Sequence, residues 1–292
     1  MSGIDAIRTV GVVGAGQMGS GIAQVAATAG YEVIMSDREQ SFLDRALSGI
    51  GASLAKLEEK GEIPKGGRDA ALARIRRTLS LEALAACDWV IEAVNESIEL
   101  KHTIFKTLDR LCPPATVLAT NTSSISITRI AAVTRRPAQV VGMHFMNPVP
   151  LMKLVEIIPG QATNPAVTEA TRALAIRMGK TPVVAQDLPG FISNRVLMPL
   201  LNEAMFALYE GVGTREDIDT VMTLGMRHPM GPLRLADYIG LDTCLSVMEV
   251  LHDGFGDPKY RPCPLLRRLV DAGHLGRKSG RGFYDYAAEA KK

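Results

Sequence analysis

A glycine-rich turn between two apolar segments constrains the fold of this chain more than any other feature. Residues 8–13 form a short apolar run typical of a buried strand, and the turn that follows reads Gly14-Ala15-Gly16-Gln17-Met18-Gly19. Apolar side chains then recur at the spacing of one helix face, at Met18, Ile22, Val25 and Ala29. Residues 31–36 predict a second strand, which ends at Asp37. A strand, a helix and a strand in this order predict an α/β sheet with parallel strands.

The turn has the spacing GxGxxG, which indicates dinucleotide binding when it lies between a strand and a helix. Gly14 permits the tight turn, Gly16 lets a pyrophosphate approach the backbone, and Gly19 lets helix and strand pack closely. The phosphates are then expected at the N-terminus of the helix. The strand–helix–strand context disfavours the alternative, which is a glycine-rich turn that binds no ligand.

Asp37 indicates which dinucleotide is bound. It lies near the spacing, about 20 residues past the glycines, at which an acid binds the ribose hydroxyls. Its carboxylate predicts NAD, because a carboxylate repels the 2′-phosphate of NADP. Arg38 keeps NADP as an alternative, since a neighbouring arginine can accommodate that phosphate.

The rest of the chain divides into an α/β part and a helical part. Helices are predicted at residues 41–60, 69–77, 98–111 and 164–178, and strands at 88–94, 116–120, 139–145, 153–158 and 181–185. After Asp187 the strand-like runs stop and helical stripes continue. We therefore predict a Rossmann-type, doubly wound α/β domain over residues 1–187 and an all-α domain over 188–292, with a frayed tail at 287–292.

Composition and charge exclude several classes of protein. The chain has 292 residues, enough for two domains, and 33 basic against 31 acidic residues give a net charge of +2, which argues against a general nucleic-acid binder. No apolar run approaches the roughly 20 residues of a membrane span, and residues 1–9 lack the apolar core of a signal peptide. The four cysteines fit no zinc spacing. We expect a cytoplasmic protein with no metal and no membrane partner, with a removed organellar leader as an alternative.

A carboxylate interrupts an apolar strand in the first part. Glu156 shares a strand face with Leu154 and Ile158, where an acid is costly unless it has a partner. The preceding strand carries His144. A histidine paired with a carboxylate is a general base that can take a proton from an alcohol. A purely structural buried pair is an equally good interpretation of these two residues alone.

Two further polar residues are candidates for a ligand site. Ser123 lies in a polar loop just past the carboxyl end of a strand, where open α/β sheets bind ligands. Asn194 begins an apolar helical stripe, so its amide either makes a buried structural bond or faces a ligand. Taken singly, each residue is better explained as structural.

Taken together, the motifs resemble the L-3-hydroxyacyl-CoA dehydrogenases, and most closely the short, stand-alone bacterial 3-hydroxybutyryl-CoA dehydrogenases. The resemblance is carried, in chain order, by VGVVGAGQMGSGIAQ, IEAVNESIELK, NTSSISIT, GMHFMNPVPLMKLVEII, PGFISNR, HPMGPLRLADYIGLD and GRKSGRGFYDY. These segments span nearly the whole chain.

The resemblance implies an NAD-dependent oxidoreductase that interconverts (S)-3-hydroxyacyl-CoA and 3-ketoacyl-CoA. It implies His144 as the general base, Glu156 as the residue that orients it, and Ser123 and Asn194 as catalytic contacts to the substrate. The implied cofactor contacts are Gly14, Gly16, Gln17, Met18, Gly19, Asp37, Glu96, Lys101, Asn121 and Lys278. The implied substrate contacts are Ser53, Lys60, Ser123, Asn147 and Asn194. It also implies a substrate site at the cleft between the domains and a homodimer through the helical domain.

Ser53 and Lys60, with Lys56, lie on one face of the predicted helix at residues 41–60. Lysines make point-charge contacts with phosphates such as those of CoA, whereas the charge pattern alone favours an ordinary solvated face. Two other functions therefore stay open. One is a dehydrogenase of a small 3-hydroxy acid or polyol acid without CoA, and the other is a non-catalytic dinucleotide-binding protein.

Overall fold

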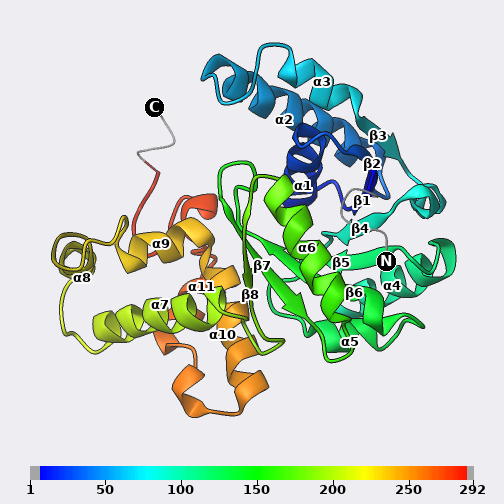
Figure 1. Ribbon diagram of the computed structural model, residues 1–292. Coiled ribbons are helices and arrows are strands. Elements are labelled where there is room, and N and C mark those ends of the chain that lie inside the picture. Colours follow the sequence, from blue (N-terminus) through cyan, green and yellow to red (C-terminus); the bar gives the residue numbers. More distant parts are fainter. Residues whose placement is uncertain (1–6, 288–292) are drawn as a thin grey trace. The chain divides into compact units, whose positions relative to one another are not determined.

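The computed structural model describes residues 7–287, which divide into two compact units with the division between Leu188 and Pro189. The named strands belong to the first unit, and the second is built from helices (Figure 1). The predicted frayed tail lies outside the described residues, apart from Ala287. No helix within residues 7–287 combines the length and the apolar character needed to cross a membrane.

The described part of the first unit contains an eight-stranded sheet in the order β3-β2-β1-β4-β5-β6-β7-β8. Its strands are β1 (Thr9–Val13), β2 (Glu32–Ser36), β3 (Ile75–Thr78), β4 (Trp89–Glu92), β5 (Val117–Thr120), β6 (Val140–Phe145), β7 (Leu154–Pro159) and β8 (Thr181–Val184). All neighbours are parallel except β6 and β7, which are antiparallel. The strand order runs outward in both directions from β1 and β4, which confirms the predicted doubly wound fold.

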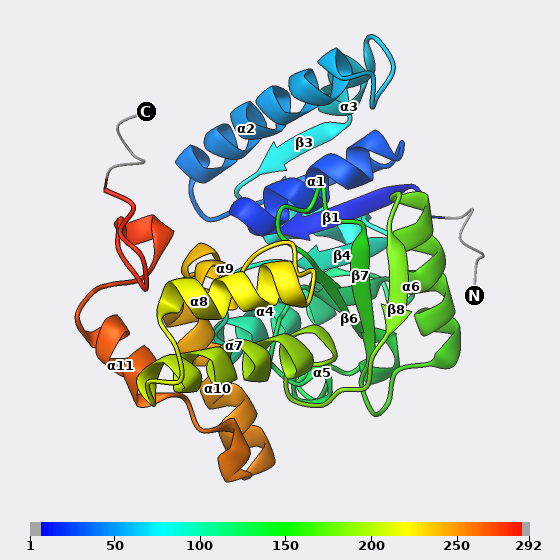
Figure 2. The same ribbon diagram turned by 90° about the vertical axis from the view of Figure 1, so that its left-hand side faces the viewer.

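Helices cover both faces of this sheet. They are α1 (Gln17–Thr28), α2 (Gln40–Glu59), α3 (Gly67–Ala73), α4 (Ile98–Leu111), α5 (Ile127–Ala131) and α6 (Pro165–Arg177). Side chains of α1, α2, α3 and α6 share one apolar core with one face of the sheet, and α4 and α5 lie on the opposite side from α6 (Figure 2). Helix starts follow local chemistry, since Ser97 caps α4 and Asn164, with Pro165 after it, caps α6.

The predicted helix at residues 69–77 is wrong in its second half. α3 ends at Ala73, and β3 follows as an edge strand that pairs with β2. Ile75 is buried, whereas Arg76 and Arg77 are exposed. With one buried side chain in so short a segment, the sequence of β3 shows no alternating pattern typical of a strand. The segment is a strand because it pairs with β2.

The second unit packs helices around its own core. They are α7 (Ser193–Tyr209), α8 (Arg215–Thr220), α9 (Pro232–Ile239), α10 (Leu241–Phe255) and α11 (Pro264–Asp271). Asp237 of α9 is fully buried, where desolvation raises its pKa, and it accepts the N–H groups of Phe283 and Tyr284, both at 2.9 Å. A Cβ on Gly282 would lie 1.9 Å from Asp237 Oδ1, so glycine lets the C-terminal segment lie directly against α9.

Candidate active site

The glycine turn joins β1 to α1, and the start of the helix packs directly against the backbone of the turn. Gly14 has φ +101°, and a Cβ on Gly19 would lie 1.8 Å from the carbonyl oxygen of Gly14. A Cβ on Gly16, by contrast, would meet nothing within 4 Å. Gly16 is also the N-cap of α1 and provides no side-chain hydrogen bond to it. The first N–H groups of α1 therefore provide the donors and the positive helix end that bind a phosphate.

Asp37 holds this turn from the end of β2. Its Oδ2 accepts the N–H of Ala15 at 2.7 Å, and its Oδ1 accepts the N–H of Arg38 at 2.7 Å. Beside it lies a cavity of about 420 Å³, within the size range of ligand pockets. The cavity is lined by the turn, Asp37 and Arg38, and by apolar side chains that include Phe42, Leu79, Leu81, Leu100 and Ile104. A glycine cradle, a ribose-binding acid and an apolar wall fit the adenosine end of NAD.

Arg38, which keeps NADP as an alternative cofactor, has an acidic neighbour. Its Nε lies 3.3 Å from Oε1 of Glu39, and 83% of the Arg38 side chain is exposed. The guanidinium is thus paired with a carboxylate, while Asp37, which also lines the cavity, supplies a second one. This charge arrangement favours a ribose with free hydroxyls over one that carries a phosphate.

His144 and Glu156 are directly opposite each other on the antiparallel strands β6 and β7. His144 Nδ1 lies 2.8 Å from Glu156 Oε2, and both side chains are buried. The predicted pair therefore exists, and strand register creates it. An ionised carboxylate can only accept, so Nδ1 carries the proton and Nε2 is the nitrogen able to take another.

Two asparagines lie next to β6, the strand that carries His144, one through a hydrogen bond and the other in the turn that follows. Asn121, just past β5, accepts the Phe145 N–H through Oδ1 at 2.9 Å, and its own N–H donates to the Glu92 carbonyl at 2.7 Å. Asn147 is exposed in the turn after β6. Lys180 is buried nearby, and its Nζ donates to the carbonyls of Val149 and, at 2.9 Å, of Met152. Lys180 thus holds the turn between β6 and β7, and burial lowers its pKa.

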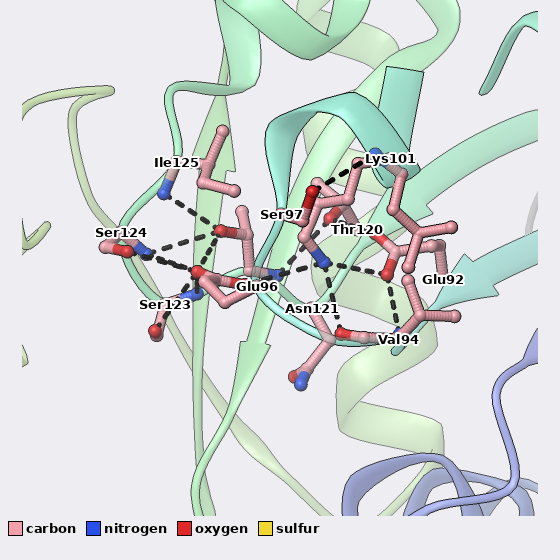
Figure 3. A network of polar contacts seen from close by, with 12 residues as sticks. Glu92, Val94, Glu96, Ser97, Lys101, Thr120, Asn121, Ser123, Ser124 and Ile125 are labelled. Atoms are coloured by element: carbon pink, nitrogen blue, oxygen red, sulfur yellow. Dashed lines mark hydrogen bonds and ion pairs between the residues drawn. The ribbon is translucent and has the colours of Figure 1, made fainter. Parts of the chain in front are cut away.

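Ser123 is hydrogen-bonded to Glu96, a residue that the resemblance assigns to cofactor binding. Glu96 Oε1 accepts the N–H of Ser123 at 2.8 Å and lies 3.2 Å from the Ser123 hydroxyl (Figure 3). Burial opposes the charge of Glu96, but Lys101 and the loop's hydrogen bonds outweigh it and hold its pKa below the usual value. Glu96 is therefore an ionised acceptor at neutral pH.

Lys101 lies inside the protein. Only 1% of its side chain is exposed, and Nζ lies 2.7 Å from Oε1 of Glu92, which is itself fully buried. The second carboxylate, Glu96, lies 3.5 Å away through Oε2. The resemblance implies a cofactor contact for Lys101, whereas the structure places its ammonium between two glutamates (Figure 3).

The residues expected to bind CoA lie on or next to α2. The Ser53 hydroxyl accepts a hydrogen bond from Nε2 of Gln24 on α1 at 3.0 Å, so Ser53 also joins the two helices. Lys60 is the C-cap of α2, and Lys56 lies one turn earlier; both are exposed.

The second unit carries the remaining predicted residues. Asn194 is in the first turn of α7, and its N–H donates to the Gly190 carbonyl at 3.1 Å. Lys278 Nζ lies 2.7 Å from Oδ2 of Asp242. Gln17 and Met18 lie in the first turn of α1, in the first unit.

Among the residues near the His144–Glu156 pair and the Ser123 loop, sequence reasoning missed the buried charged side chains of Glu92 and Lys180. Glu92 ends an apolar strand in the same way that Glu156 interrupts one, so the rule that identified Glu156 would also have identified Glu92. Lys180 follows a glycine and precedes a short strand, and no sequence pattern indicates that it is buried.

Comparison with known proteins places both units in one family. The model of the 3-hydroxyacyl-CoA dehydrogenase NAD-binding domain matches residues 9–188, and that of the C-terminal domain matches 190–286. A probable 3-hydroxybutyryl-CoA dehydrogenase of Bacillus subtilis is 58% identical over 280 residues, 96% of this chain and 98% of the relative. A 3-hydroxybutyryl-CoA dehydrogenase of Bradyrhizobium diazoefficiens is 53% identical over 96% of both chains.

A solved structure agrees with these relatives. The crystal structure of (S)-3-hydroxybutyryl-CoA dehydrogenase from Ralstonia eutropha has a TM-score of 0.94 and 48% identity, covering 97% of this chain and 100% of that one. Both family models match in order, and similar relatives extend over nearly the full length. The chain therefore belongs to the 3-hydroxyacyl-CoA dehydrogenase family.

Proposed function

We propose that this chain is an NAD-dependent dehydrogenase that interconverts (S)-3-hydroxybutyryl-CoA and acetoacetyl-CoA. The observation that carries the proposal is the buried His144–Glu156 pair in the NAD-binding unit. Support for a short acyl chain comes from relatives of 53% and 58% identity named for 3-hydroxybutyryl-CoA.

The proposed mechanism uses the pair as a general base. Glu156 accepts the Nδ1 proton of His144, which leaves Nε2 to take the proton of the substrate 3-hydroxyl. The adjacent carboxylate stabilises the resulting imidazolium. When bound, NAD supplies the hydride acceptor for C3 of the substrate. In the reductive direction the same Nε2 returns its proton to the C3 oxygen.

The other site assignments are proposals of the same kind. Ser123, Asn147 and Asn194 contact the substrate, and Ser123 and Asn194 position its C3 oxygen. The glycine turn, Asp37 and the neighbouring cavity bind the cofactor, with further contacts from Gln17, Met18, Glu96, Lys101, Asn121 and Lys278. Residues 1–187 form the cofactor domain, and 188–292 contribute substrate and subunit contacts. The cytoplasmic location stays a prediction from the sequence.

Removing either member of the base pair should slow the chemical step. His144→Gln and Glu156→Gln are each expected to lower kcat by about 10²–10⁴-fold, because general-base catalysis is lost. Rates are measured with acetoacetyl-CoA and NADH, and NADH affinity by fluorescence titration should hardly change. Glu169→Gln, on the exposed face of α6, is the control. Turnover at the wild-type rate in the His144 variant would refute the assignment.

The preference for NADH over NADPH should depend on Glu39, the ion-pair partner of Arg38. The wild-type protein is expected to have a higher kcat/KM with NADH than with NADPH. Glu39→Gln should raise kcat/KM for NADPH about three- to tenfold, because Arg38 loses its ion-pair partner and can meet the 2′-phosphate. The double variant Arg38→Gln/Glu39→Gln should lose this gain. A wild-type preference for NADPH would contradict the prediction.

Lys60 should matter only to substrates that carry the CoA nucleotide. Lys60→Ala is expected to raise KM for acetoacetyl-CoA about two- to fivefold, since a point-charge contact with phosphate is lost, and to leave KM for a truncated acetoacetyl thioester unchanged. Lys65→Ala, in the turn after α2, is the control. An equal change in KM for both substrates would refute the contact between Lys60 and CoA and would favour a dehydrogenase of small non-CoA hydroxy acids.

We also propose a homodimer through the helical unit. Support comes from large apolar side chains exposed there, with Val212, Leu224 and Met226 each more than 60% exposed. Sedimentation of the wild-type protein should give the mass of two chains, and Leu224→Glu should shift it toward one chain. A single-chain mass for the wild type at micromolar concentration would disprove the dimer.

A further inference from the structure

The turn that joins β6 to β7 is held by very few buried groups of its own. Of residues 146–153, all of which the structure describes, Val149 alone is buried, with 2% of it exposed, and residues 151–153 are exposed. The turn connects the strand that carries His144 to the strand that carries Glu156. Its path therefore depends on the contacts that anchor Val149 and the backbone beside it.

The first anchor is a contact between Val149 and helix α1. A Cβ on Gly21 of α1 would lie 2.7 Å from the Cβ of Val149 and 3.5 Å from Cδ of Pro150. Real Cβ atoms do not approach a neighbour as closely as 2.7 Å, so glycine at this position lets the turn lie directly against the helix. Gly21 is two residues past Gly19, in the helix whose N-terminus is suited to bind phosphate. The turn thus packs on the helix that is expected to bind the cofactor.

The second anchor is the ammonium of Lys180. This residue lies between α6 and β8 and is buried, with 7% of it exposed. Its Nζ donates to the carbonyl of Val149 and, at 2.9 Å, to that of Met152. Its own backbone N–H donates to the Ala175 carbonyl at 2.9 Å, which fixes the start of the side chain. Hydrogen bonds from a charged donor are stronger than those between neutral groups, so the two carbonyls are held firmly.

The path of the turn matters to the base because it helps to set how β6 and β7 are aligned. His144 is directly opposite Glu156 in the observed register. A shift of one residue would turn every side chain of one strand to the opposite face, and in a hairpin the turn fixes the register. Smaller movements of the turn would change the 2.8 Å distance between His144 Nδ1 and Glu156 Oε2.

We propose that Lys180 and Gly21 are positioning residues for the reaction, which clamp the turn between β6 and β7 from two sides. The clamp keeps His144 aligned with Glu156 and at a fixed place relative to α1. This inference rests on the proposed function, since it takes the pair to be the general base, and it deepens that function. It links the helix expected to bind the cofactor to the strands that carry the base through direct packing.

Removal of the ammonium should slow the chemical step more than it weakens binding. Lys180→Met keeps an apolar side chain and loses the donors. It is expected to lower kcat for acetoacetyl-CoA about 10–100-fold, because a displacement of about 1 Å at a reacting group costs up to that much, with KM and the Kd of NADH changed less than about twofold. Lys106→Met, at an exposed position of α4, is the matched control. A lower Tm with unchanged kcat, measured well below that Tm, would overturn the proposal.

Gly21→Ala tests the clamp from its other side and keeps the proposal open to refutation if Lys180→Met does not fold. Alanine favours a helix, so α1 should form, and the added methyl group should push the turn away. The kcat should fall about tenfold with the Kd of NADH nearly unchanged. Gly49→Ala is the matched control, because a Cβ there would meet nothing within 4 Å. Wild-type kcat in Gly21→Ala, or a weaker Kd for NADH with unchanged kcat, would count against the clamp.

The tautomer of His144 provides a readout that needs no turnover. NMR spectra of the histidine ring nitrogens, assigned with His144→Gln, should show the Nδ1-protonated form in the wild-type protein, because Glu156 accepts that proton. In Lys180→Met and Gly21→Ala the signals should move toward the mixture of tautomers of a free imidazole. Unchanged signals in both variants would refute the effect on the pair. A wild-type protein inactive on acetoacetyl-CoA would refute the proposed function instead, and the tautomer would still decide whether the clamp aligns the pair.

Discussion

The ion pair between Glu92 and Lys101 is the interaction on which the candidate site of the first unit depends. Glu92 ends β4, one of the two strands from which the sheet runs outward, and its side chain binds the end of β5 and helix α4. Its carbonyl accepts the Asn121 N–H, and Asn121 in turn accepts the N–H of Phe145, the residue after His144. A continuous set of hydrogen bonds therefore connects the centre of the sheet to the strand that carries the base.

Two buried carboxylates in this unit have similar surroundings and different partners. Glu156 is paired with a histidine, whose second ring nitrogen is a base that can accept a proton from a substrate. Glu92 is paired with a lysine ammonium that also donates to the Val94 carbonyl, so that pair is suited to hold a structure. The free-energy cost of burying a carboxylate is thus offset at Glu156 by an imidazole that can take part in proton transfer, and at Glu92 by an ammonium with a structural role.

Much of the fold could be predicted from the sequence, because strong periodicity marks most of its strands and helices. The antiparallel partner of β6 could not be derived, although alternation placed Glu156 on an apolar face and His144 on the preceding strand. Glu92 was missed although its sequence context resembles that of Glu156. Lys101 illustrates a different limit, because the motif gives its position in the sequence, whereas its burial between Glu92 and Glu96 could be seen only in the structure.

The two edge strands of the sheet affect how readily one molecule can associate with another. An edge strand presents unpaired N–H and C=O groups that can template a strand from another molecule. On one edge β3 exposes Arg76 and Arg77, and on the other β8 contains Pro182, which has no N–H to offer. Charge repulsion and a missing donor therefore oppose the growth of one sheet into the next in a concentrated solution. The arginines that give β3 a poor strand signal are the same residues that oppose edge-to-edge pairing.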